Sequence, residues 1–162
     1  MSITISNISV EKLPKKKLAY IEHMGPYQGD TELFGKLFTY VMEWAQPKGL
    51  MNDPKVEAIT IYPDDPKTIP ESQQRIRVGF TVPEDTTAEN DIQVLEIPEG
   101  SYAVGSFEIL PNEYGSAWNE VFEYIKNKNL VPTDMMYESY KNEPGTHPEG
   151  KHIVDINVML QH

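Results

Sequence analysis

The chain has no cysteine and no long apolar segment, and both absences narrow its possible chemistry. Without cysteine it can form no disulfide, no thiolate nucleophile and no cysteine-ligated metal site. No uncharged apolar run approaches the ~20 residues that a membrane span needs, and no apolar stretch follows the lysines near the start of the chain. We therefore expect an unexported, soluble protein with no membrane partner, located by default in the cytoplasm.

Histidines are few, and the common nucleotide and hydrolase motifs are missing. The four histidines show neither His-x-x-x-His spacing nor a supporting carboxylate, so we interpret them as surface residues: His23, His147, His152 and His162. The sequence contains no Gly-x-Gly-x-x-Gly segment, no Walker loop and no Gly-x-Ser-x-Gly elbow. It therefore predicts no metal site and no cofactor, and it does not support nucleotide or serine-hydrolase chemistry.

Basic residues are also scarce: 14 Lys and Arg stand against 25 Asp and Glu, for a net charge of −11. The resulting field repels phosphate backbones and favours cationic small molecules or basic protein surfaces, so direct binding of nucleic acid is disfavoured. The basic cluster formed by Lys12 and Lys15–Lys17 falls between the first two predicted strands. A solvated turn explains it better than a phosphate site does.

The chain contains one structural pattern written twice. Each copy runs through two extended segments, an amphipathic helix and two more extended segments, first over Ser2–Pro83 and again over Asp91–His162. The acidic, threonine-rich segment Glu84–Asn90 separates the copies. A duplicated motif fits 162 residues without a long linker, so we expect a single domain over residues 1–162.

Periodicity places the elements of both copies. The predicted strands are rich in β-branched and aromatic residues: Ile3–Val10, Leu18–Met24, Val56–Tyr62, Arg75–Val82, Ile92–Ile97, Tyr102–Leu110, Met135–Tyr140 and Ile153–Leu160. Helices are predicted over Leu33–Ala45 and Tyr114–Ile125, the second capped by Asn112. The first two strands of each copy are expected to form a hairpin. This repeated β-β-α-β-β order predicts an α+β fold of antiparallel sheets with helices packed on them and a groove where the halves meet.

Several short segments occur in a characteristic order. They are Glu22-His23-Met24-Gly25-Pro26-Tyr27-Gln28-Gly29, Gly100-Ser101-Tyr102-Ala103-Val104, Trp118–Ile125, Tyr137-Glu138-Ser139-Tyr140 and Val154–Val158. In order and spacing they resemble the GyrI-like (gyrase-inhibitor-like) effector-binding domains over nearly the whole chain. One departure is Leu110-Pro111-Asn112-Glu113-Tyr114, which stands where many members carry a second Gly-Pro-Tyr turn. The resemblance implies a pseudo-twofold pair of sheet-and-helix units, a central groove for bulky, often cationic compounds, and a glutamate on the strand after the second helix.

Glu138 is the residue that matches this glutamate. Strand alternation places Met136, Glu138 and Tyr140 on one face, where apolar and aromatic neighbours would partly desolvate the carboxylate. A delocalised cation in the groove would then be attracted by the carboxylate and by aromatic faces. Periodicity alone favours a solvated carboxylate on an edge strand, whereas the resemblance favours the ligand-binding role.

Aromatic residues are the second part of the predicted site. Several fall at element ends that should border the groove: Tyr27, Tyr102, Trp118 and Tyr140. Others at helical spacing are interpreted as core: Phe34, Phe38 and Phe122. Trp118 either seals the second helix onto the sheet or stacks on a ligand, and Tyr27 either packs the turn or contacts a ligand. The candidate ligand-binding set is Glu138, Tyr140, Met136, Trp118, Tyr102 and Tyr27.

Three functions are compatible with these observations. The first is a stand-alone module that binds bulky aromatic, cationic compounds, as effector domains of multidrug-responsive transcription regulators do, with any DNA-binding role left to a separate partner. The second, taken from the resemblance, is hydrolysis of reactive cyclopropane-bearing genotoxins, with Glu138 as the catalytic base and Trp118 positioning the substrate. The third is interaction with a protein partner, as in gyrase inhibition. The sequence leaves open whether the protein is an enzyme.

Overall fold

The computed structural model describes residues 4–27, 30–143 and 145–161. The chain forms two compact units. The first unit combines Met1–Pro14 with Glu99–His162, and the second unit comprises Lys15–Pro98. The residues of the two predicted repeats that lie outside the described residues are Ser2, Ile3, Gln28, Gly29, Pro144 and His162.

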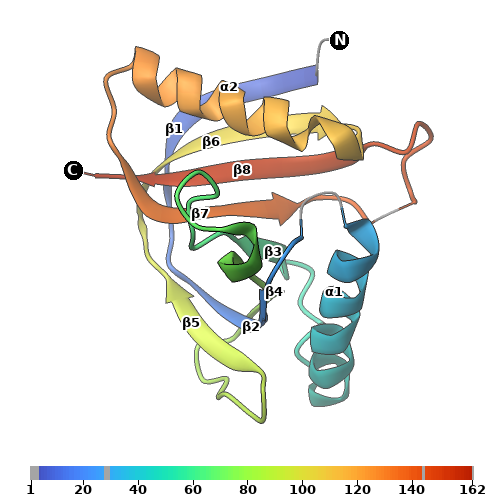
Figure 1. Cartoon of the computed structure of the whole chain (residues 1–162). Helices are drawn as coiled ribbons and strands as arrows, with labels where there is room; N and C mark the ends of the chain where they lie inside the picture. The colour runs from blue at the N-terminus through green and yellow to red at the C-terminus, as the bar shows by residue number, and fades with distance from the viewer. Residues whose placement is uncertain (1–3, 28–29, 144, 162) are drawn as a thin grey trace. The chain divides into compact units, whose positions relative to one another are not determined.

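The first unit contains four antiparallel strands paired in the order β1-β6-β8-β7 and one α-helix (Figure 1). Their bounds are β1 Thr4–Leu13, β6 Gly100–Ile109, α2 Tyr114–Asn127, β7 Pro132–Tyr140 and β8 His152–Leu160. The helix lies across β6 and β8 and buries its apolar stripe, which includes Ala117, Val121 and Ile125, against them. Gly105 permits this approach, because a Cβ there would lie 2.8 Å from a methyl carbon of Val121.

The second unit has the same composition of elements. Its strands pair antiparallel in the order β3-β4-β2-β5, and its helix α1 packs mainly against β4. The bounds are β2 Lys16–Met24, α1 Thr31–Ala45, β3 Ala58–Ile61, β4 Arg75–Val82 and β5 Gln93–Ile97. The Asp30 carboxylate caps α1 by accepting a hydrogen bond from the Leu33 N–H at 3.0 Å. After the helix, Gly49 adopts a positive φ of 74°, which ends the short 3-10 turn Gln46–Lys48.

The duplicated α+β order of the elements is confirmed, and both helices and the strands lie where periodicity predicts them. The predicted cap of α2 is wrong. A 3-10 turn, Pro111–Glu113, precedes the helix and Glu113 takes the capping position in place of Asn112. The Glu113 carboxylate instead accepts a hydrogen bond from the Leu110 N–H at 2.7 Å. Among the described residues, neither α-helix combines the length and apolarity needed to cross a membrane.

The two predicted hairpins are also wrong. The strand β1 pairs with β6, and β5 pairs with β2, so each repeat contributes its first strand to the unit built around the other repeat's helix. The connecting residues are Pro14-Lys15 and Pro98-Glu99. Two-residue hairpin loops favour turns whose first central residue has a positive φ, and proline is fixed near −65°. A tight hairpin is therefore disfavoured at both connections.

Candidate functional site

Glu138 is a buried charged residue in the first unit. It lies near the end of β7 opposite Ile156 of β8, and only 3% of it is exposed. Alternation along β7 puts Met136 and Tyr140 on the same face of the sheet, where both pack against the core under α2. The solvated carboxylate on an edge strand that periodicity alone favours is therefore not what the structure contains.

Two neutral donors hold the carboxylate. The Trp118 indole Nε1–H donates to Glu138 Oε2 at 2.7 Å, and the Tyr140 hydroxyl donates to Oε1 at 2.6 Å. Hydrogen bonds to an ionised acceptor are shorter and stronger than neutral ones, which offsets part of the cost of burying the carboxylate. Neither of these two donors carries a formal charge, and both orient the carboxylate.

Trp118 connects this carboxylate to the surface. Its indole stacks on the ring of Phe122, one helical turn further along α2, with centroids 5.9 Å apart and planes inclined by 29°. Phe122 is 39% exposed, so its interpretation as a core residue is wrong. The aromatic surface on α2 thus runs from solvent to the buried carboxylate. The hydrogen bond from Trp118 to Glu138 is part of neither predicted role, sealing the helix onto the sheet or stacking on a ligand.

A second polar pair lies in the same unit. The Tyr114 hydroxyl and His152 Nδ1 are 2.6 Å apart, and their rings meet edge to face. Burial, with the negative charge of Glu138 as a further cause, raises the pKa of Tyr114 above its usual value, while burial lowers the pKa of His152. Both side chains therefore remain neutral near pH 7. The interpretation of His152 as a surface histidine is wrong, because the loop before it brings it to the start of β8, against α2.

His147 is likewise not a simple surface residue. Its Nε2 lies 2.6 Å from the Glu108 carboxylate, and its Nδ1 accepts a hydrogen bond from the Glu149 N–H at 2.9 Å. These contacts tie the loop after β7 to the end of β6. Across residues 4–27, 30–143 and 145–161, no group of three or more potential metal ligands gathers.

Tyr102 lies on the other face of the same sheet. Tyr102 pairs with Met159 of β8. The preceding residue, Val158, pairs with Met136 and faces α2, so Tyr102, like Met159, faces the opposite side of the sheet. Its ring is fully buried and contacts Tyr137 edge to face at 6.0 Å, and burial raises the pKa of Tyr102 to about 12. Within this unit, Tyr102 therefore does not share the surface that carries Glu138.

Tyr27 belongs to the second unit. It is 7% exposed and packs against Phe34 at 6.3 Å and Tyr62 at 5.8 Å between ring centroids. This aromatic cluster rests on Ile76 and Val78 of β4. The turn-packing role of Tyr27 is thus present in the structure, and its contact with a ligand remains a prediction.

Comparisons with known proteins agree with this architecture. The family model described as the GyrI-like small molecule binding domain matches residues 6–161. DNA gyrase inhibitor 2 of Dickeya dadantii (strain 3937) is 33% identical over 132 residues, which cover 78% of this chain and 80% of that protein.

Two solved structures share the fold. The EcmrR C-terminal domain superposes with a TM-score of 0.78 at 14% identity and covers 96% of this chain and 97% of its own. SAV2435 bound to tetraphenylphosphonium superposes with a TM-score of 0.64 at 13% identity, over 96% of this chain and 94% of its own.

Proposed function

Because the chain belongs to the GyrI-like small molecule binding domain family, we propose that the site around Glu138 binds bulky aromatic cations. The observation that carries the proposal is the carboxylate itself, which is 3% exposed and held by two neutral hydrogen-bond donors. A buried negative charge among aromatic side chains is complementary to a delocalised cation that has little affinity for water.

The attraction at such a site is sizeable. Two unit charges 4 Å apart interact by about 4 kcal/mol at the effective dielectric constant of ~20 that suits protein sites, against ~1 kcal/mol in water. A ring face in contact with the cation contributes roughly 0.5–2 kcal/mol more. Together these terms amount to roughly 4.5–6 kcal/mol, which is less than the ~8 kcal/mol of a micromolar complex, so burial of the ligand's apolar surface must supply the remainder and offset the loss of translational freedom.

The roles of the side chains follow from their positions. Glu138 supplies the charge, and the stacked rings of Trp118 and Phe122 supply the aromatic surface that leads to it. Met136 and Tyr140 line the same face of β7, where the polarisable thioether of Met136 can adapt to ligand shape. SAV2435, whose structure contains tetraphenylphosphonium, supports this class of ligand for a chain of the same fold.

Charge selectivity is the sharpest test. Tetraphenylphosphonium and tetraphenylborate have nearly the same shape and opposite charge, so a thermal-shift comparison isolates the electrostatic contribution. We expect tetraphenylphosphonium to raise the melting temperature of the wild type, because a ligand that binds the native state stabilises it. Tetraphenylborate should give no such shift.

Two variants test whether the shift in melting temperature depends on Glu138. Glu138→Gln should abolish most of the shift with tetraphenylphosphonium, while Glu123→Gln, which removes an exposed carboxylate from α2, should leave it intact. Equal shifts with both ions, or equal shifts in wild type and Glu138→Gln, would remove Glu138 from the site.

Hydrolysis of a reactive substrate is the alternative function of this site. Both oxygens of Glu138 already accept a hydrogen bond, so abstraction of a proton from water would weaken a contact that orients the carboxylate. This arrangement favours capture of a ligand over turnover. Incubation of the protein with a reactive cyclopropane-bearing arene, followed by chromatography, would reverse this preference if the ring opened at a rate dependent on Glu138.

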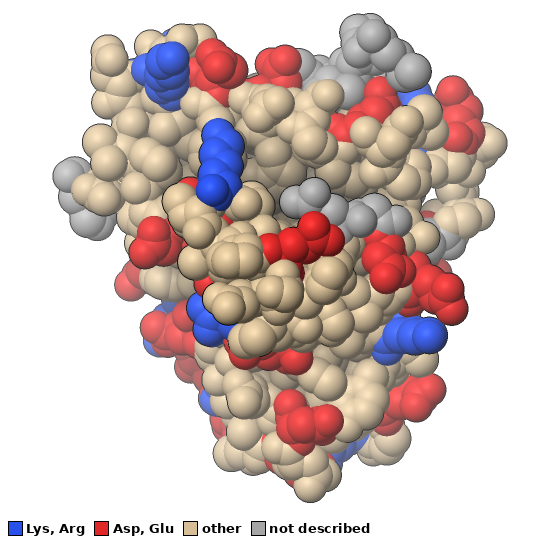
Figure 2. All heavy atoms as spheres, in the orientation of Figure 1, with Lys and Arg blue, Asp and Glu red and all other residues tan. Residues whose placement is uncertain are grey.

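Interaction with a protein is a second candidate, favoured by the similarity to DNA gyrase inhibitor 2. Acidic side chains are spread over the face shown in Figure 2, without a single concentrated patch. A gyrase supercoiling assay with increasing amounts of this protein tests the role directly. Inhibition that weakens steeply with salt would support an electrostatic interface.

A further inference from the structure

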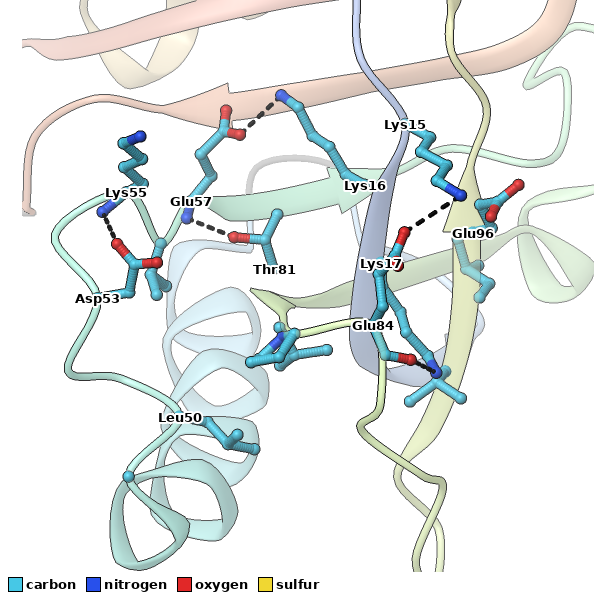
Figure 3. A pocket seen from close by; sticks show the side chains of 16 residues that line it. Lys15, Lys16, Lys17, Leu50, Asp53, Lys55, Glu57, Thr81, Glu84 and Glu96 are labelled. Carbon is cyan, nitrogen blue, oxygen red and sulfur yellow. Dashed lines mark hydrogen bonds and ion pairs between the residues drawn. The ribbon is translucent and has the colours of Figure 1, made fainter.

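A hollow lies entirely within the second unit, and neither Glu138 nor its hydrogen-bond partners line it. It has a volume of about 800 Å³ and is bordered by the start of β2, the end of β4, the strand β5 and the segment after α1 (Figure 3). This volume falls in the range of roughly 300–1,000 Å³ that is typical of small-molecule sites. From the sequence, Lys15–Lys17 are interpreted as part of a solvated turn, and no motif indicates a binding site there.

Its interior surface is partly apolar. Four half-buried aliphatic side chains from three different segments line it: Leu50, Val56, Val82 and Val94. They continue the core beneath α1, against which Val56, Val82 and Val94 pack. A ligand with an apolar body would remove these side chains from water, at about 25 cal/mol per Å² of area buried.

Ion pairs fix the walls of the hollow. Lys16 contacts Glu57 at 2.6 Å, with only 19% and 21% of the two side chains exposed, and spans the end of β4. On the β5 side, Lys15 contacts the Glu84 carboxylate at 3.2 Å, and Lys17 Nζ donates to the Glu84 carbonyl oxygen at 2.7 Å. The half-buried Lys16–Glu57 pair therefore holds its wall in place, whereas Lys15 and Glu84, with 52% and 76% of their side chains exposed, form a surface contact that contributes little.

Four charges on the walls have no ion-pair partner in the part of the chain that the structure describes: Asp53, Lys55, Lys17 and Glu96. Asp53 and Lys55 stand on one wall, linked through the Lys55 N–H. Lys17 and Glu96 are cross-strand neighbours on the other wall. Each wall therefore presents one positive and one negative charge. A ligand with a single charge meets a like charge on whichever wall it approaches, whereas a zwitterion can pair at both ends.

We propose that this hollow binds a short apolar peptide with free ends. Its ammonium group pairs with Glu96 and its carboxylate pairs with Lys55 on the opposite wall, because Lys17 already donates to the Glu84 carbonyl and Asp53 already accepts from the Lys55 N–H. Its apolar side chains cover the aliphatic surface between them. The site is independent of Glu138 and of the ligand class proposed for it.

Calorimetry with four forms of trileucine tests the assignment on the full chain. Trileucine with free ends should bind, and acetylation of its amino end or amidation of its carboxyl end should each weaken binding about tenfold, the loss of one ion pair. Trileucine blocked at both ends should bind weakest of the four. Glu138→Gln should leave these affinities unchanged, which separates this site from the proposed cation site.

Variants that remove one charge from each wall test where the peptide binds. Lys55→Gln and Glu96→Gln alter exposed side chains, so both should fold, and each should weaken binding of free trileucine several-fold. Lys36→Gln, an exposed lysine on α1 outside the hollow, is the matched control and should have no effect. No heat of binding at millimolar trileucine, equal binding of the fully blocked peptide, or unchanged affinity in both wall variants would each overturn the proposal.

Discussion

Removal of the Tyr140 hydroxyl tests whether Glu138 is held as a charged group. The hydroxyl donates to Oε1 at 2.6 Å, and the carboxylate is 3% exposed, so solvent cannot easily replace the lost donor. Hydrogen bonds to charged groups contribute about 1.5–3 kcal/mol to stability, against ~1 kcal/mol for neutral pairs. We therefore predict that Tyr140→Phe lowers the free energy of unfolding by about 2 kcal/mol in the wild type.

A double-mutant cycle with Glu138→Gln isolates the contribution of the charge. In the Glu138→Gln background the same hydroxyl faces a neutral amide, so Tyr140→Phe should cost only ~1 kcal/mol there, a coupling of about 1 kcal/mol. Urea unfolding followed by tryptophan fluorescence measures all four proteins. Tyr124→Phe is the control, because its hydroxyl has no hydrogen-bond partner in the described part of the chain, and it should change stability by less than ~0.5 kcal/mol. Additive effects of the two substitutions, within ~0.5 kcal/mol, would refute the charged hydrogen bond.

Three further outcomes follow from packing, titration and capping. Gly105→Ala should destabilise the protein by about 1–3 kcal/mol in chemical unfolding, because the added Cβ would overlap the core. Gly115→Ala, in an open position on α2, should instead stabilise the protein by roughly 0.5–1 kcal/mol. A stabilising Gly105→Ala would contradict the observed packing. Burial lowers the pKa of His152, so the unfolded chain binds that proton more readily, and the free energy of unfolding should fall as the pH drops below 6.5, the ordinary value. His152→Gln should make this pH dependence shallower, and an unchanged slope would show that His152 is not the group responsible. Asp30→Ala should cost about 0.5–2 kcal/mol through loss of the cap of α1, and thermal unfolding unchanged by the substitution would exclude the cap as a stabilising contact.

Local patterns were sufficient to predict the elements. Alternating apolar residues locate β4 at its observed bounds, Arg75–Val82, and three-four spacing locates both helices. The same alternation correctly places Met136, Glu138 and Tyr140 on one face of β7. These features depend on residues close together in the sequence, which is why a single sequence contains them.

Features that depend on distant residues were not predictable in the same way. Which strand pairs with β1 is decided by tertiary packing, although Pro14 and Pro98 were a signal against tight hairpins. The 39% exposure of Phe122 depends on how α2 packs in the folded unit, which periodicity does not report. The pairing of His152 with Tyr114 joins residues 38 positions apart and left no motif in the sequence.

Binding of tetraphenylphosphonium by wild type and Glu138→Gln, measured by isothermal titration calorimetry at one ionic strength, tests the central claim most directly. If the buried carboxylate is what attracts the ligand, the substitution removes the charge while keeping the shape, and the dissociation constant should rise by about tenfold or more. Dissociation constants that agree between the two proteins would contradict the account, whatever their absolute value.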